Sequence, residues 1–174
     1  ITEKLCIYMH NLRSAETIIV LYHNLKSVEI PKREANAMKY ISTRGKGEPM
    51  ESANAVLQGI AKDGGLLVPT EIPKVDPDFI DALQTMTYQE RAVKILGLFL
   101  TDYTEEELKG CVERAYGNEK FDTEAVAPVR KVADKTVLEL WHGPTSAFKD
   151  MALELLPQLM QTALEKTGET KTIQ

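Results

Sequence analysis

The sequence predicts an α/β protein in which a helical region over residues 38–125 precedes a strand–turn–helix unit over residues 126–174. Apolar residues recur at helical spacing in the first region, and its two longer segments each begin with a threonine that can cap a helix. Two short β-branched runs flank a turn in EAVAPVRKVADKTVLEL (124–140), which predicts the strands.

Residues 1–37 differ from the rest because they contain one short apolar run and no sustained helical or strand periodicity of apolar residues. The Ala-Asn-Ala that precedes Met38 is similar to a vector-derived scar before an initiator methionine. We treat residues 1–37 as an extension of doubtful origin, and a native N-terminal strand or helix is the alternative.

The first elements after this extension are short. Apolar residues at 53, 56, 57 and 60 predict a helix, which DGG (63–65) ends with Gly64 as the left-handed residue. LLVP (66–69) predicts an extended segment, and PDFIDALQ (77–84) predicts another short helix.

Two longer helices follow. Thr87 caps TYQERAVKILGLFL (87–100), and Thr104 begins the next helix with Glu107 at the spacing of a capping box. Gly117 ends that second helix.

A last helix is predicted from about residue 146 to residue 167, with Thr145 or Ser146 as its N-cap and Gly168 as its end. Pro157 removes one hydrogen bond and clashes with the carbonyl of Leu153, so we expect a kink or a break there. ETKTIQ (169–174) has the composition of a strand that has only begun. A β–α unit without its second strand leaves apolar faces uncovered, so we expect the sequence to be truncated within a domain.

Lys149 occupies an unusual place, because the first turn of a helix is partly positive and disfavours a cation. Helical spacing places its stem beside Ala152 and Leu156, so we expect the amine to lean toward the protein. Burial and the helix dipole then both favour the neutral amine, the nucleophile that forms a Schiff base with an aldehyde cofactor. The alternative is a structural lysine paired with Asp150.

The composition excludes several other classes of function. With 43% hydrophobic residues and a formal net charge of −5, the 174-residue chain has no general attraction to nucleic acid or anionic membranes. The run IIVLY (18–22) is too short to span a membrane. Cys6 and Cys111 stand alone and the three histidines are far apart, so we expect no metal site and a reducing cytoplasm.

Three segments and their spacing resemble one known family: YISTRG (40–45), VLQGIAKDGGLLVP (56–69) and LELWHGPTSAFKD (138–150). They are similar to the N-terminal third of threonine synthase, the pyridoxal-phosphate enzyme that converts O-phosphohomoserine and water to threonine and phosphate. The resemblance covers residues 38–174.

The resemblance implies roles for individual residues. Lys149 matches the lysine that holds pyridoxal 5'-phosphate as a Schiff base and then moves protons on the substrate. Thr43 and Arg44 lie in a matched segment, and a guanidinium suits the substrate phosphate, although a structural ion pair is the alternative for Arg44. His142 is expected to shape the turn before the helix, without a catalytic role.

The resemblance also implies a domain organisation. Residues 38–125 would form the N-terminal domain, and residues 126–174 would begin a pyridoxal-phosphate-binding domain of the tryptophan synthase β-subunit type (fold type II). The family's Ser-Gly-Asp-Thr-Gly loop and the loop for the cofactor phosphate would lie beyond Gln174, so we expect these 174 residues alone to be inactive. The alternative function is a non-catalytic fragment that acts as a binding module, and the oligomeric state stays open.

Overall fold

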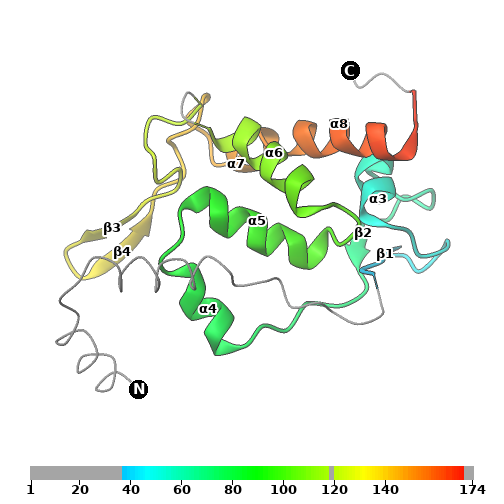
Figure 1. Ribbon diagram of the computed structural model, residues 1–174, viewed down its shortest axis with the longest axis horizontal. Helices are drawn as coiled ribbons and strands as arrows, with labels where there is room; N and C mark the ends of the chain where they lie inside the picture. Colours follow the sequence, from blue (N-terminus) through cyan, green and yellow to red (C-terminus); the bar gives the residue numbers. More distant parts are fainter. Residues whose placement is uncertain (1–36, 118–119, 171–174) are drawn as a thin grey trace, which may run out of the picture.

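The computed structural model describes residues 37–117 and 120–170. The expected extension therefore lies outside the described residues except for Ala37, and so do residues 171–174 of the expected last strand. The described elements, in chain order, are β1 (Tyr40–Ser42), α3 (Ser52–Gln58), β2 (Leu67–Pro69), α4 (Pro77–Leu83), α5 (Tyr88–Phe99), α6 (Glu105–Tyr116), β3 (Val129–Val132), β4 (Lys135–Leu138), α7 (Asp150–Leu153) and α8 (Leu156–Thr167) (Figure 1).

Helices α5 and α6 confirm the capping signals. The Thr87 hydroxyl accepts the N–H of Glu90, whose carboxylate accepts the N–H of Thr87 in return. Thr104 and Glu107 make the same reciprocal pair at the start of α6, which ends at Gly117. Each box satisfies N–H groups that the first turn of a helix leaves without partners.

The end of α3 differs from the prediction. The helix stops at Gln58, and Gly59 supplies the cap with a positive φ of 69°. Gly64 also has a positive φ, 77°, but it lies in the turn that leads to β2. The glycine nearer to the apolar segment ends the helix, and the DGG sequence makes the following turn.

The strands β1 and β2 form a small antiparallel pair, with Ile41 opposite Val68. A side chain at Gly65 would place its Cβ 2.2 Å from the Ser42 hydroxyl, so this position accepts no residue larger than glycine. Asp63 joins the two ends of the loop, because its carboxylate accepts hydrogen bonds from the Ser42 hydroxyl and the Gly65 N–H.

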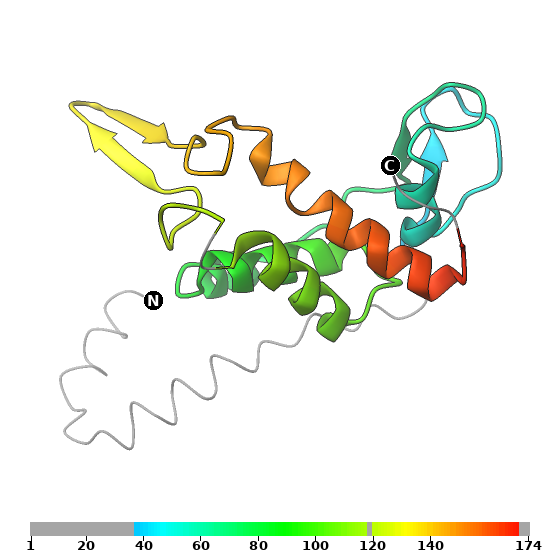
Figure 2. The ribbon, with the colours of Figure 1, turned by 90° about the horizontal axis from the view of Figure 1, so that it is seen from above.

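One hydrophobic core lies where α8 packs against α3 and α6. Figure 2 shows α8 running across the helical body from the hairpin end to the β1–β2 end. Cys111, Ala115 and Ala163 have no exposed surface (0%), so small side chains lie at the centre of this core. Residues from both sides of position 125 therefore contribute to the same core.

The strands β3 and β4 confirm the predicted pair of strands and form an antiparallel hairpin with Val129 opposite Leu138. The hairpin projects from one end of the helical body in both ribbon views (Figures 1 and 2). Its turn contains Ala133 with a φ of 54°, a conformation that costs a residue with a Cβ more than it costs glycine. In residues 37–117 and 120–170 both sheets are two-stranded and antiparallel, so the helices and strands occur without a parallel crossover.

The expected single helix over residues 146–167 is divided in two. The four-residue α7 ends at Leu153, and α8 begins at Leu156, with Pro157 in its first turn, where a missing N–H costs no hydrogen bond. The predicted break is therefore confirmed. The predicted start was wrong, because helix begins only at Asp150. Gly168, with a φ of 66°, ends α8 as expected.

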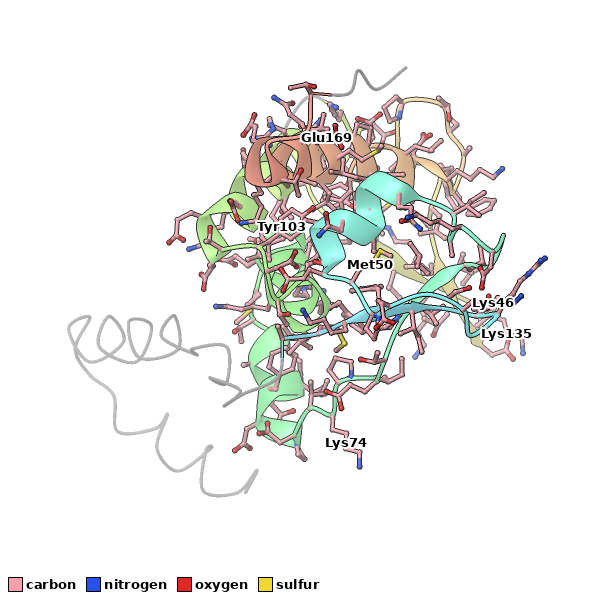
Figure 3. All side chains as sticks on the ribbon, turned by 90° about the vertical axis from the view of Figure 1, so that its right-hand side faces the viewer. Lys46, Met50, Lys74, Tyr103, Lys135 and Glu169 are labelled. Atoms are coloured by element: carbon pink, nitrogen blue, oxygen red, sulfur yellow. The ribbon has the colours of Figure 1, made fainter. Side chains whose placement is uncertain are left out.

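The loop between α5 and α6 ties the body together. Tyr103, labelled in Figure 3, is buried, and its hydroxyl donates to the carbonyl of Leu159 in α8 at 3.1 Å. The neighbouring Asp102 accepts the hydroxyl of Ser52 and, at 2.9 Å, the N–H of Ala53. Asp102 thus caps α3 from a distant part of the chain, since Glu51 at the N-cap position makes no side-chain capping bond.

We expect Asp102→Ala to lower the free energy of unfolding by about 2 kcal/mol. The helix α3 loses its cap, and Ser52, which is only 1% exposed, loses the acceptor of its hydroxyl proton. Denaturant unfolding followed by circular dichroism measures this change. Asp134→Ala is the matched control, because that side chain is 77% exposed in the hairpin turn, and we expect a change within about 0.5 kcal/mol. Equal effects of the two substitutions would contradict the capping role of Asp102.

Candidate functional site

Lys149 is the residue immediately before α7, and its side chain is exposed. This corrects the expected first-turn position and the expected burial of the amine. Ala152 and Leu156, the helical neighbours predicted to cover the stem, are exposed as well. The apolar row that faces the core contains Leu155 and Leu159 instead.

The ammonium group of Lys149 makes no hydrogen bond or ion pair with any residue of the described ranges. The alternative of a pair with Asp150 is therefore wrong as well. The amine is accessible to an aldehyde, so Lys149 fits a cofactor that binds through an aldehyde group, but the burial that was expected to activate it is absent in the described residues.

The loop before Lys149 is organised by Asp150, which is only 2% exposed. One carboxylate oxygen accepts the Thr145 N–H at 2.8 Å and the other accepts the Thr145 hydroxyl at 2.6 Å. The hydrogen bond from the Thr145 hydroxyl is the main cause that lowers the pKa of Asp150 below its usual range, against the opposing effect of burial.

This geometry explains why neither predicted N-cap begins a helix. Thr145 donates its hydroxyl proton to Asp150 instead of accepting an N–H from the first turn. Ser146 has a φ of 56°, which is incompatible with the extended backbone of an N-cap residue. Backbone bonds from the Ser146 N–H to the Gly143 carbonyl and from the Asp150 N–H to the Ala147 carbonyl, both 3.0 Å, close the loop.

His142 lies at the base of the hairpin between two carboxylates. Its Nδ1 is paired with Asp122, and its Nε2 is 2.8 Å from Glu139. These two partners, Glu139 first, raise the pKa of His142 above its usual value. The His142 carbonyl accepts the N–H of Asp122 at 3.1 Å, and the ring stacks on Trp141.

Glu139 and His142 are only three residues apart, so their spacing in the sequence could have indicated the pair. Asp122 had none, because it lies 20 residues from His142. The contacts agree with a role for His142 in shaping the chain before α7.

Thr43 and Arg44 follow β1, at the end of the molecule opposite the hairpin and α7 (Figures 1 and 2). The Thr43 hydroxyl accepts the N–H of Leu66 at 3.0 Å, and the Arg44 guanidinium donates to the carbonyl of Asp63 at 3.1 Å. Both residues therefore hold the loop between the two strands, and the structure does not bring them together with Lys149.

A groove of about 830 Å³ runs between α5 and α6. Its lining combines apolar Met86, Val93 and Val112 with the ion pair between Lys94 and Glu105, whose N–O distance is 3.6 Å. The groove is separate from the loop around Lys149, and none of the predicted site residues lines it.

Large apolar side chains are exposed around the loop that contains Lys149. Phe148, Trp141 and Leu153 are 67%, 50% and 57% exposed.

Within residues 37–117 and 120–170, no cluster of three or more His, Cys, Asp or Glu side chains is arranged to hold a metal ion. None of the helices in the same ranges has the length and apolar content that a bilayer crossing needs.

Comparisons with known proteins agree with the resemblance seen in the sequence. The family described as threonine synthase N terminus matches residues 39–116. The threonine synthase of Pseudomonas aeruginosa is 39% identical over 138 residues, which cover 78% of this chain and 29% of the relative. That of Methylobacillus glycogenes is 36% identical over 144 residues, covering 78% of this chain and 30% of the relative.

Solved structures give the same result. The crystal structure of PLP-bound threonine synthase from Brucella melitensis superposes with a TM-score of 0.71 at 40% identity, over 76% of this chain and 28% of that protein. The chain spans about 30% of the length of the curated relatives it matches. The similarity therefore concerns one segment of a larger enzyme.

The raised pKa of His142 leads to a pH dependence. Since the folded protein binds the proton more tightly than the unfolded chain, the contribution of this residue to stability is complete below a pH of about 6.5 and is lost as the pH rises through the folded pKa. We expect the difference in unfolding free energy between the wild type and His142→Gln to shrink over that rise. Denaturant unfolding at a series of pH values measures it, and a difference that grows with pH would show that the two carboxylates do not stabilise the imidazolium.

Proposed function

Because residues 39–116 are a threonine synthase N-terminal segment, we propose that the protein to which this chain belongs converts O-phosphohomoserine and water to threonine and phosphate. In this proposal Lys149 is the catalytic residue and binds pyridoxal 5'-phosphate. Residues 126–174 belong, in the same proposal, to the beginning of a cofactor domain of the tryptophan synthase β-subunit type, fold type II. The similar threonine synthase from Brucella melitensis was solved with PLP bound, which supports the choice of cofactor.

One observation carries the assignment of Lys149. Its amine is exposed and has no partner among the described residues, while its carbonyl accepts the N–H groups of Ala152 and Leu153 at 3.0 and 2.9 Å. The backbone is therefore fixed and the nucleophile is accessible, which is the combination that a covalent cofactor site needs.

The chemistry divides between cofactor and protein. Pyridoxal phosphate, when bound, supplies an electron sink that stabilises negative charge on substrate carbons. Lys149 would hold the cofactor through its amine and, when that amine is free, would move protons at the α-, β- and related carbons of the substrate. Those proton transfers accompany loss of the γ-phosphate and addition of water at the β-carbon.

Thr43 and Arg44 are proposed as groups that bind the substrate phosphate. The Arg44 guanidinium keeps donors that its bond to the Asp63 carbonyl does not use, and the Thr43 hydroxyl, an acceptor for Leu66, keeps its own proton to donate. The alternative is a structural role in the loop between β1 and β2, which the contacts of both residues and their position at the end opposite α7 support (Figures 1 and 2).

The second candidate function is a non-catalytic binding module. The exposed Phe148, Trp141 and Leu153 favour it, because a group of large apolar side chains on a surface marks a place where another protein surface packs. The two candidates differ in one property, since only the enzyme requires a specific reaction of Lys149 with the cofactor.

Covalent trapping distinguishes the two functions. In the protein that carries this segment, we expect pyridoxal phosphate followed by borohydride to label Lys149 in preference to Lys46 and Lys74, whose side chains also project into solvent (Figure 3). Peptide mapping by mass spectrometry locates the label, and phosphate release from O-phosphohomoserine by the protein carrying this segment measures the activity.

Lys149→Ala provides the control. Because the side chain is exposed, we expect the unfolding free energy to change by no more than about 0.5 kcal/mol, while the visible absorbance of the bound cofactor disappears. Label spread evenly over the exposed lysines, or absorbance that persists in Lys149→Ala, would refute the enzyme proposal.

A further inference from the structure

The position after Lys149 holds a charged side chain that the proposed chemistry does not use. Asp150 is 2% exposed, yet in the described residues no cation is paired with its carboxylate. A buried charge is costly unless hydrogen bonds replace its hydration. Thr145 supplies them, through its N–H and its hydroxyl, one to each carboxylate oxygen.

These bonds close the loop that leads to Lys149. Gly143 completes the closure, because a Cβ at this position would lie 2.6 Å from both the Cβ and a carboxylate oxygen of Asp150. The glycine thus lets the Asp150 side chain pack directly on the backbone of the loop. Ser146 adopts its left-handed conformation inside this closed loop, a strained state that persists only where surrounding contacts hold it.

The other side of Lys149 is held by α7, whose Ala152 and Leu153 N–H groups bind the Lys149 carbonyl. We infer that Asp150 is a positioning residue, which ties Thr145 and thereby fixes the backbone from which the Lys149 amine reaches its cofactor. The part of this inference that concerns the cofactor rests on the proposed function. The part that concerns the loop does not.

Asp150 has no direct contact with the Lys149 amine. The two side chains form no ion pair, and both carboxylate oxygens are engaged by Thr145. Asp150 therefore acts through the loop. Position matters here because a displacement of about 1 Å in a reacting group can cost about 100-fold in rate.

Two substitutions separate hydrogen bonding from charge. In Asp150→Asn the amide oxygen can accept the Thr145 N–H while the amide nitrogen donates to the Thr145 hydroxyl, so both contacts survive without the charge. Asp150→Ala removes both. Glu165→Gln, on the exposed face of α8, is the control for loss of one negative charge.

Hydrogen exchange of the whole chain tests the loop. We expect the Thr145 and Ser146 amides to exchange about tenfold faster in Asp150→Ala, with little change in Asp150→Asn or Glu165→Gln and none in the α6 core. Thr145→Val removes the hydroxyl that binds Asp150, and Thr145→Ser, its matched control, keeps a hydroxyl. Because Thr145 is exposed, neither substitution puts folding at risk. Unchanged exchange at Thr145 and Ser146 in both Asp150→Ala and Thr145→Val would overturn the inference.

Trapping with pyridoxal phosphate and borohydride tests the effect on Lys149. We expect the label at Lys149, relative to Lys74, to fall about tenfold in Asp150→Ala and Thr145→Val and less than about threefold in Asp150→Asn. Faster loop exchange with an unchanged share of label at Lys149 would overturn the positioning role. Wild-type protein that shows no preference for Lys149 would refute the proposed function, and the exchange data would then decide the role of Asp150 in the loop by themselves.

Discussion

The packing of α8 against α3 and α6 is the constraint on which the rest of the structure depends. Cys111, Ala115 and Ala163 are fully buried in the core that these helices form, where a larger side chain would overpack the interior. Tyr103 then binds a carbonyl of α8 from the loop between α5 and α6. Since α8 follows α7 after only two residues, this contact also fixes the place from which the loop around Lys149 projects.

Features that depend on a few neighbouring residues could be predicted from the sequence. Thr87 and Thr104 cap their helices through bonds that span three residues, and Gly168 ends α8 without help from other elements. The hairpin was predicted from two β-branched runs and the turn between them. In each case the interaction that decides the structure lies within the segment that carries the signal.

Features decided by distant contacts could not be predicted. The cap of α3 comes from Asp102, about 50 residues away. The apolar residues after Lys149 lie in two rows along the helical segment, one with Ala152 and Leu156 and the other with Leu155 and Leu159. Only the packing of α8 on α3 and α6 decides that the second row faces the core. At the candidate site the lysine proposed to hold the cofactor was identified from a motif, but its exposed place before α7 could not be predicted, because Thr145 binds Asp150 and the helix begins only at Asp150.

The hairpin has a consequence for how the protein behaves in solution. Within residues 37–117 and 120–170 neither β3 nor β4 has a partner on its outer edge, and Val129, Val132 and Leu138 are exposed. Open edges with exposed apolar side chains are templates for strand pairing between molecules. The net charge of −5 opposes that approach through repulsion, which salt screens over a Debye length of about 8 Å at physiological ionic strength. Added salt is therefore expected to favour association of molecules through the hairpin.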